Sequence, residues 1–502
     1  MTHATATTPT LSLRGHEIPT GLYIGGRWEP TATAVDVVNP ATGTSLGTVA
    51  DARPEDAMRA LDAAVAARES WSAMSPRARA DLFHSAHRLL TERAEAFADV
   101  MTLESGKPRS ESAGEFALSL GFFQWFAEQI AHMHGSYAPA GNGGFRVITT
   151  LQPVGPTLLI TPWNFPMLMN ARKGGAALAA GCTVVLKSAK ETPFTAALFV
   201  KTLEDAGFPP GVVNLVHSND SAAVTAPLLA DRRLRKVSFT GSTQVGSILL
   251  AQAAANITNS SMELGGDGPF IVLDDADVDL AVEQALVCKF RNAGQACVAA
   301  NRIIVHEGVA DEFTAKFVAG ARALSMGDGF DPSNAVGPMI SAAQRDRVAG
   351  LVQNFQESGY AELLTGGAAA AGEGYFFEPT VLAFDRADHE WCNEEIFGPV
   401  AAIYRIGSAR EALEVANDTT YGLAAYVFTR DMSRAVTLAE RLEFGMVGVN
   451  RGIMAEPSAP FGGIKSSGLG REGGHEALMD FLEPKYIALT VDEEGAFADD
   501  VR

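Results

Sequence analysis

Residues 157–216 read TLLITPWNFPMLMNARKGGAALAAGCTVVLKSAKETPFTAALFVKTLEDAGFPPGVVNLV, and this stretch decides the fold class. Apolar runs of strand length alternate in it with longer segments of helical character. Strands are expected at 157–160, 183–186 and 212–216, and helices at 167–180 and 194–205. Such alternation predicts βαβ units and a parallel sheet. Right-handed crossovers bring the loops after the strands to one edge, where ligands bind.

The α/β pattern continues beyond this stretch. A further strand is expected at 235–239, directly before Gly241-Ser242-Thr243-Gln244-Val245-Gly246, which opens a helix. A second α/β region begins near Pro269. Its expected elements are a helix at 278–290 and strands at 270–273, 302–305, 400–405, 424–428 and 447–449. The sequence therefore predicts an α/β fold with more than one sheet.

The chain has 502 residues, which is too long for one core and predicts two or three domains. Pro54 is expected to start a helix, and a second helix is expected at 76–93. Residues 1–20 are expected to form a flexible tail. The strand-like segments 145–152 and 486–491 fit neither α/β region, and unpaired strands of this kind usually seek a partner.

Composition excludes several classes of protein. The net charge of −20 repels phosphates, so we expect no nucleic-acid partner. No apolar run reaches the roughly 18–20 residues of a membrane span, and the N-terminus lacks the apolar centre of a secretory signal. Four scattered cysteines favour a reducing compartment, and no metal site has the required spacing. We therefore expect a cytoplasmic protein.

The cysteines other than Cys297 are Cys182 and Cys288, both expected to be structural, and Cys392, to which no role is assigned.

Three segments carry residues suited to thiol chemistry. Cys297 follows Arg291-Asn292-Ala293-Gly294-Gln295-Ala296 in a polar loop, where we expect a reactive thiol to be exposed. Glu263 precedes Leu264-Gly265-Gly266, also in an expected loop, and could act as a general base. Asn164 lies between two prolines in Pro162-Trp163-Asn164-Phe165-Pro166, and its amide could hold an oxyanion.

Together these segments resemble the aldehyde dehydrogenase superfamily, and the resemblance covers about residues 20–490. It implies that Cys297 attacks an aldehyde carbon, that a nicotinamide accepts hydride, and that water hydrolyses the resulting thioester. It also implies a Rossmann-type dinucleotide-binding domain, an α/β catalytic domain and a small β oligomerisation arm of a dimer or tetramer. The implied bounds are 1–133 and 153–264 for the first domain, 265–465 for the second, and 134–152 and 480–496 for the arm.

The cofactor residues are assigned from the same resemblance. The segment Gly241–Gly246 has a glycine at each end and leads into a helix, whose N-terminus suits a pyrophosphate. Glu395 is expected at the nicotinamide ribose, with Phe397 nearby. The full set of expected cofactor residues is Trp163, Lys187, Ser188, Lys190, Gly241, Ser242, Gly246, Leu264, Glu395 and Phe397.

The choice between NAD and NADP depends on the segment 187–193. The family pattern Lys-Pro-Ala-Glu is replaced by Lys187-Ser188-Ala189-Lys190. The acid of the family pattern accepts the ribose 2′-hydroxyl and repels a 2′-phosphate, whereas a lysine can pair with that phosphate. We therefore predict that NADP is accepted or preferred, although the neighbouring Glu191 opposes this.

The substrate is expected to carry a carboxylate. Segments 170–173, 289–292 and 460–473 resemble those of succinate-semialdehyde dehydrogenases, and the resemblance places Arg172 and Arg291 on the distal carboxylate. The hydroxyl donor of that subfamily is not evident in 451–459, where Glu456 would be unfavourable and Arg451 or Ser458 could compensate. Glutarate or 2-oxoglutarate semialdehyde would suit the same arginines.

Two further readings remain open. One is oxidation of aliphatic, aromatic or amino-aldehydes, with no role for the arginines. The other is a non-catalytic scaffold, which need not keep Cys297, Glu263 and Asn164 together.

Overall fold

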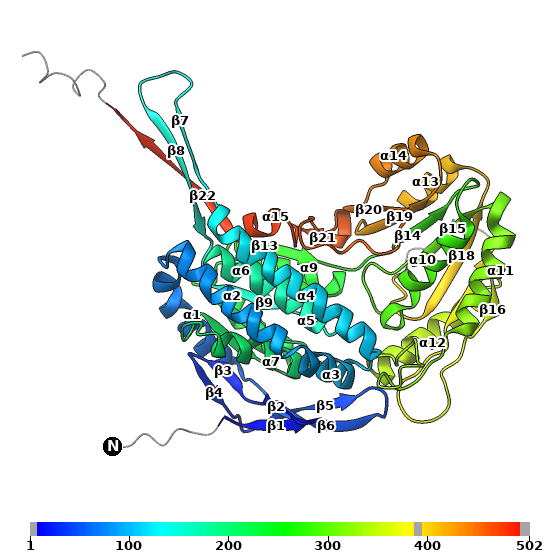
Figure 1. The fold of residues 1–502 in the computed structure, drawn as a ribbon, viewed down its shortest axis with the longest axis horizontal. Coiled ribbons are helices and arrows are strands. Elements are labelled where there is room, and N and C mark those ends of the chain that lie inside the picture. Colours follow the sequence, from blue (N-terminus) through cyan, green and yellow to red (C-terminus); the bar gives the residue numbers. More distant parts are fainter. Residues whose placement is uncertain (1–7, 386–393, 492–502) are drawn as a thin grey trace, which may run out of the picture.

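The computed structural model describes residues 8–385 and 394–491. Its first sheet has eight strands in the order β21-β13-β12-β9-β10-β11-β3-β4 (Figure 1). The five central strands are parallel: β9 (Thr157–Ile160), β10 (Val184–Lys187), β11 (Val213–Val216), β12 (Lys236–Thr240) and β13 (Asn259–Glu263). The antiparallel edge strands are β3 (Leu22–Ile24), β4 (Arg27–Glu29) and β21 (Gly468–Leu469).

The parallel strands are doubly wound. The chain runs outward from β9 to β10 and β11, and then returns to the other side of β9 to form β12 and β13. The direction of winding therefore reverses between β9 and β12. Ligands of open α/β sheets bind beyond the carboxyl ends of the strands at such a switch point. The loops that start at Thr161 and Gly241 leave the sheet there.

Helices cover both faces of this sheet because alternate strand residues point to opposite sides. Leu158 and Val185 pack with one set of helices, and Leu159 and Leu186 pack with the other. The first set is α1 (Pro54–Ser72), α8 (Ser221–Ala230) and α9 (Thr243–Ala254). The second set includes α2 (Pro76–Glu92), α3 (Ala94–Ser105), α4 (Arg109–Gln129), α5 (Pro166–Met169), α6 (Gly175–Ala180) and α7 (Pro193–Asp205).

The second sheet has seven strands in the order β16-β17-β18-β15-β14-β19-β20. Its parallel strands are β14 (Pro269–Val272), β15 (Arg302–His306), β17 (Thr380–Phe384), β18 (Val400–Ile406), β19 (Ala424–Phe428) and β20 (Met446–Val449), and β16 (Ala361–Thr365) is an antiparallel edge. One face packs on α10 (Val278–Phe290), α11 (Glu307–Ala323) and α12 (Ala342–Glu357), and the other packs on α13 (Ala409–Asn417) and α14 (Met432–Arg441).

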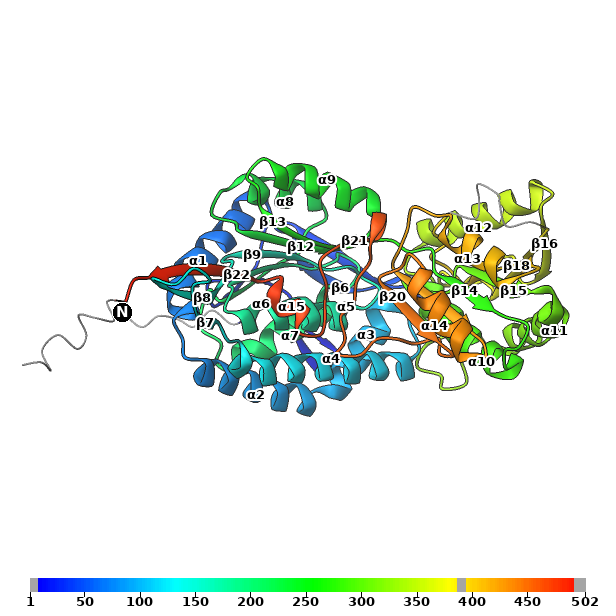
Figure 2. The ribbon, with the colours of Figure 1, turned by 90° about the horizontal axis from the view of Figure 1, so that it is seen from above.

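The two sheets lie along the long axis of the molecule (Figure 2). The chain crosses from the first to the second between β13 and β14, and returns after β20 to pair β21 with β13. Short helical turns η1 (Ile130–His132), η3 (Arg291–Gly294), η5 (Lys465–Ser467) and helix α15 (Glu476–Met479) complete the body. No helix within the described ranges combines the length and apolarity that a bilayer crossing requires.

Two small sheets and an arm complete the fold. The N-terminal hairpins are β1 (Thr10–Leu13) with β2 (His16–Pro19), and β5 (Ala34–Asn39) with β6 (Thr44–Ala50). The arm consists of β7 (Ser136–Pro139), β8 (Arg146–Pro153) and β22 (Leu482–Leu489), with β8 in the middle. Figure 1 shows that the arm projects from the body. From Glu483 to Leu489 every residue of β22 is exposed.

The predicted α/β class is confirmed, and three local expectations are wrong. Residues 10–19 form the β1–β2 hairpin instead of a flexible tail, because Ile18 is fully buried in the core. The helix expected at 167–180 is interrupted by a π-helical turn, η2 (Asn170–Gly174). Glu263 is the last residue of β13, not a loop residue. Cys392 and residues 492–496 of the expected arm lie outside the described residues.

Candidate active site

Two cavities meet at Cys297. The first, of about 600 Å³, lies at the switch point of the first sheet, and loops and helices of both α/β regions line it. The second, of about 310 Å³, lies between α4, the start of α5 and the loop that follows β20. Both cavities include Cys297 and Met169 in their walls. A thiol at this junction can reach a group in either cavity.

The thiol is held in its protonated form. The Cys297 side chain is partly exposed, but burial and the nearby Glu263 carboxylate raise its pKa to about 12. Nucleophilic attack by sulfur requires the thiolate. The site must therefore remove the thiol proton during the reaction.

Glu263 is suited to that task. Its side chain is only 4% exposed, and neither carboxylate oxygen has a hydrogen-bond partner in the described residues. Burial and the charge of Glu472 raise the pKa of Glu263 well above its usual value. Close packing adds to its burial, because a Cβ at Gly462 would lie 2.7 Å from its Oε1 atom. An unpaired buried carboxyl beside a thiol can accept a proton that a solvated carboxylate would not hold.

The loop that carries Cys297 is buried, which corrects the expectation of an exposed polar loop. Asn292 and Ala293 have φ values of 52°, and Gly294 has 69°, so three successive residues are left-handed. A Cβ at Gly294 would lie 2.1 Å from the Gly398 carbonyl oxygen. The polar side chains of the loop bond inward: the Gln295 amide donates to the Asn292 carbonyl at 3.0 Å and accepts from the Ile340 N–H at 2.9 Å.

Asn164 contacts the same loop. Its Nδ2 atom donates to the Gln295 carbonyl at 3.1 Å, while its Oδ1 atom is buried without a partner in the described part of the chain. The side-chain amide therefore already spans from the loop after β9 to the loop of the thiol. Small rotations of this amide would aim its N–H at an oxygen bound next to Cys297.

Six of the expected cofactor residues line the 600 Å³ cavity: Trp163, Gly241, Ser242, Leu264, Glu395 and Phe397. The Trp163 and Phe397 rings meet edge to face, with centroids 5.6 Å apart. The Glu395 Oε1 atom accepts from the Gly266 N–H at 3.1 Å, and burial raises the pKa of Glu395 to about 7. Gly246 instead lets α9 approach β13, because a Cβ there would lie 2.4 Å from Leu264.

This cavity fits a dinucleotide. The Ser242 side chain caps the twelve-residue helix α9, whose first turn faces the cavity and suits a phosphate. Gly241 has no space for a side chain, since a Cβ there would lie 2.4 Å from the Phe239 ring, and its backbone is open to a ligand. The Trp163 and Phe397 rings supply apolar surface for a planar ring.

Lys187, Ser188 and Lys190 do not line the 600 Å³ cavity. The Lys187 amine donates to the Ser221 hydroxyl at 2.6 Å, and burial lowers its pKa to about 8. Ser188 is buried and bonded to His217 Nδ1 at 2.7 Å. Lys190 alone is exposed, and it makes no ion pair in the described residues.

The two expected substrate arginines both line the 310 Å³ cavity, but they differ in burial and in their ion pairs. Arg172 lies on η2, is 1% exposed, and forms an ion pair with Glu472, which also pairs with Lys173. Arg291 is half-buried, lies over the Phe165 ring at 5.3 Å, and has no ion pair within the described residues. Of the two arginines, only Arg291 makes no ion pair within the described residues, although its charge also acts on Glu111 in the same cavity wall.

The loop at 451–459 contributes apolar groups to this cavity. Ile453 and Ala455 line it, whereas Arg451, Glu456 and Ser458 do not. The Ser458 hydroxyl donates to the Glu456 carboxylate at 3.0 Å on the exposed side. The expected compensation of Glu456 by Ser458 thus takes place away from the cavity.

Sequence reasoning missed several charged groups at the site. Glu472 and Lys173 were inside segments noted for their resemblance, and only the buried ion pairs reveal their role. Lys107, Glu111 and Glu115 also line the 310 Å³ cavity. Two carboxylates four residues apart on a helix look like a solvated face, so the sequence held no signal for them. Within the described ranges, no three His, Cys, Asp or Glu side chains gather as a metal site.

Comparison with known proteins agrees with this geometry. A profile of the aldehyde dehydrogenase family matches residues 28–487. The chain belongs to the aldehyde dehydrogenase family. It is 49% identical over 444 residues to a succinate-semialdehyde dehydrogenase of Paenarthrobacter nicotinovorans, covering 88% of this chain and 98% of the relative.

Two similar proteins from Escherichia coli extend the comparison. A succinate-semialdehyde dehydrogenase described as NADP(+) is 44% identical over 468 residues, covering 93% of this chain and 97% of the relative. The crystal structure of an NADP dependent enzyme superposes with a TM-score of 0.93 at 43% identity, covering 94% of this chain and 98% of the other. Family and fold are thus shared over nearly the whole chain.

Proposed function

We propose that this chain oxidises a short aldehyde with a distal carboxylate, in the first place succinate semialdehyde, with NADP as the preferred acceptor. The observation that carries the proposal is Arg291, a cation that makes no ion pair within the described residues and lines a 310 Å³ cavity that ends at Cys297. A guanidinium pairs with a carboxylate in a defined geometry. Relatives described as succinate-semialdehyde dehydrogenases support the choice of substrate.

The proposed reaction uses three residues. Glu263 takes the proton of the Cys297 thiol, and the sulfur attacks the aldehyde carbon to form a thiohemiacetal. The Asn164 amide and the Cys297 backbone N–H donate to the oxyanion, and each such donor is worth roughly 3 kcal/mol. A bound nicotinamide dinucleotide supplies the acceptor for the hydride that leaves this carbon. After Glu263 has released the thiol proton to solvent, it removes a proton from water, and the water oxygen attacks the thioester carbon. The sulfur leaves as a thiolate and takes this proton back from Glu263.

The cofactor preference rests on Lys190. Of the two residues that depart from the family pattern, Ser188 is bonded to His217, whereas Lys190 is exposed and makes no ion pair within the described residues. A 2′-phosphate can therefore gain an ion pair with Lys190, and no acid at that position repels it. The relative from Escherichia coli described as NADP(+) supports this assignment.

A substrate panel with both dinucleotides tests the proposal. Wild type should show its highest kcat/KM for succinate semialdehyde with NADP, then glutarate semialdehyde, then propanal. Arg291→Ala should lower kcat/KM for the two semialdehydes by about 10²-fold, since a charge-assisted pair is lost, and leave propanal within about threefold. Lys190→Glu should reverse the cofactor preference. Equal losses for propanal and succinate semialdehyde would refute the role of Arg291.

The domain division and the assembly belong to the same proposal. We place the dinucleotide-binding domain at 1–133 and 153–264, the catalytic domain at 265–465, and the arm at 134–152 and 480–496. The two sheets and the projecting strands support this division. The exposed strand β22 supports association of two or four copies through the arm. A cytoplasmic location stays a prediction from the sequence.

A further inference from the structure

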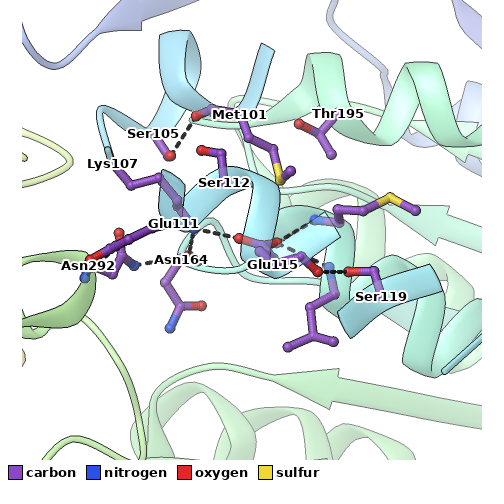
Figure 3. A network of polar contacts seen from close by, with 12 residues as sticks. Met101, Ser105, Lys107, Glu111, Ser112, Glu115, Ser119, Asn164, Thr195 and Asn292 are labelled. Atoms are coloured by element: carbon purple, nitrogen blue, oxygen red, sulfur yellow. Dashed lines mark hydrogen bonds and ion pairs between the residues drawn. The ribbon is translucent and has the colours of Figure 1, made fainter. Parts of the chain in front are cut away.

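A buried ion pair lies next to Asn164, in the wall of the cavity of about 310 Å³ that also reaches Cys297. The Lys107 amine contacts a Glu115 carboxylate oxygen at 2.6 Å, and both side chains are 1% exposed (Figure 3). Lys107 precedes α4, and Glu115 lies in its second turn. Burying two charges costs more free energy than their attraction returns in many proteins, so such a pair is weak evidence of a stabilising role alone.

The pair contacts the backbone on both sides of Phe165. The Lys107 amine donates to the Asn164 carbonyl at 2.7 Å and lies 4.6 Å from the centre of the Phe165 ring. The other Glu115 oxygen accepts from the Met167 and Leu168 N–H groups at 2.9 and 3.1 Å, at the start of α5. The turn that carries the Asn164 amide is therefore fixed at both ends by one charged unit.

The Asn164 carbonyl also joins the loop of the thiol. It accepts a second bond from Asn292 Nδ2 at 3.0 Å, and the same amide nitrogen lies 3.2 Å from the Gln295 carbonyl. The Asn292 N–H donates to Glu111 at 2.8 Å, one turn before Glu115 on α4. Figure 3 shows these groups converging on Asn164 from α4 and from the loop of Asn292. One helix thus holds both loops that must meet around a reacting carbonyl.

We propose that Lys107 and Glu115 are positioning residues that set the Asn164 amide relative to the Cys297 sulfur. The pair touches no reacting atom and acts through the Asn164 carbonyl and the start of α5. This inference rests on the proposed function only in its assumption that Asn164 donates to an oxyanion on a carbon attacked by Cys297. Oxyanion stabilisation is sensitive to donor placement, so a loosened turn lowers the rate more than the affinity.

Two reactions of the thiol separate positioning from folding. Acylation of Cys297 by p-nitrophenyl acetate passes through a tetrahedral oxyanion and needs no dinucleotide. Alkylation of Cys297 by iodoacetamide displaces iodide at a saturated carbon and forms no oxyanion. The charges that act most strongly on the Cys297 pKa are those of Glu263, Arg172, Glu395 and Glu472, so alkylation should report a nearly unchanged thiol in Lys107 and Glu115 variants. Both rates are measured by mass spectrometry of the purified full chain.

The variants are Lys107→Met, which removes the donor, and the double variant Lys107→Met/Glu115→Gln, which leaves no uncompensated buried charge. The double variant keeps the experiment interpretable where the single one fails to fold. Arg79→Met is the matched control, because Arg79 is also a buried cation that donates to backbone carbonyls, those of Ala179 and Trp71 at 3.1 and 3.2 Å. It lies outside both cavities of the site.

We expect both Lys107 variants to acylate about 10- to 100-fold more slowly than wild type, with alkylation within about twofold. With an aldehyde substrate, kcat should fall by the same factor and KM should change by less than about threefold. Arg79→Met should lower Tm and leave the acylation rate unchanged. Acylation at the wild-type rate in a folded Lys107 variant, or a parallel loss of alkylation, would overturn the inference. Failure to oxidise semialdehydes would refute the proposed function without affecting this acylation test.

Discussion

The chemistry of single residues here depends on environment more than on residue type. Cys297 would be a weak nucleophile at neutral pH, because burial and the Glu263 carboxylate raise its pKa to about 12. Glu263 is itself shifted upward by burial and by Glu472. Each group thus discourages ionisation of the other, and the pair keeps one proton on the thiol until a substrate gives the sulfur a carbon to attack and Glu263 accepts that proton.

Replacing Glu263 tests this coupling. Glu263→Gln should lower steady-state turnover by about 10²- to 10⁴-fold, as expected for loss of a general base. The rate of deacylation should also fall. A burst of about one equivalent of reduced dinucleotide per site should therefore precede the slow phase. The negative charge that raises the thiol pKa is removed, so the rise of the iodoacetamide alkylation rate between pH 7 and 10.5 should move to lower pH. A shift to higher pH would contradict the coupling.

Lys289 offers a test on stability. Its amine is fully buried with no partner in the described residues, and burial lowers its pKa to about 7. In the unfolded chain this lysine stays protonated up to about pH 10.4. Between about pH 7 and 10.4, folding therefore requires the Lys289 amine to lose its proton. Below about pH 7, folding instead buries the charged amine. The resulting loss of stability grows as pH falls from about 10 and is complete below about 7.

Lys289→Met should therefore raise Tm, by roughly 2–4 °C at pH 6, with a gain that shrinks towards zero at pH 10. Thermal unfolding at a series of pH values measures this difference. Exposed Lys190→Met is the control, and its Tm should differ little from wild type at any pH. A gain at pH 6 no larger than that at pH 10 would show that Lys289 is not held neutral.

At the scale of elements, the π-helical turn η2 carries two cations that act on the pKa of Glu263. Arg172 and Lys173 are consecutive residues of this turn, and both pair with the same carboxylate, Glu472, which lies about 300 positions away in the chain. Lys173 also donates to the Ser238 hydroxyl at 3.0 Å. This cluster, with two cations and one anion, shifts the pKa of Glu263 through its charges, without a hydrogen bond to Glu263.

Removing the acid of this cluster should have two effects. Glu472→Gln leaves two buried cations uncompensated, so the free energy of unfolding should fall by about 3–5 kcal/mol. Loss of its charge should also lower the pKa of Glu263, because Glu472 raises it, and the acidic limb of the kcat–pH profile should move to lower pH. The control is Glu443→Gln, which removes an exposed partner of Lys465. An acidic limb that moves to higher pH would contradict this account.

The elements differ in how far the sequence could predict them. Buried parallel strands such as β9 and β19 are continuous apolar runs, so their bounds matched closely. The π turn η2 could not be predicted, because one extra residue in a turn leaves the apolar pattern nearly unchanged. The hairpin β1–β2 was missed because its stability comes from Ile18 in a distant core. Lys107 and Glu115 became recognisable only through contacts with Asn164.

At the scale of the molecule, the proposed association through the arm is separate from the site in the body. Cys297 and Asn164 of one copy of the chain line the same cavity, and Glu263 of that copy is buried close enough to raise the Cys297 pKa. The arm contributes no residue to either cavity. Its strand β22 exposes Ile487 and Leu489 by 42% and 46%, and these residues share one face because side chains alternate along a strand. Exposed apolar strands of this kind mark a surface for association.

Ile487→Asp/Leu489→Asp should therefore convert the assembled protein to a smaller species, since carboxylates are costly to bury between strands. Light scattering coupled to size-exclusion chromatography at several concentrations measures the change in mass. Lys485→Ser, on the same face of β22, is the matched control and should keep the wild-type mass. Turnover per chain should stay within a few fold, because each copy holds a whole site. Wild-type mass in the double variant would place the contact between copies elsewhere, and abolished turnover in a folded smaller species would mean that the body needs a neighbouring copy to hold its site.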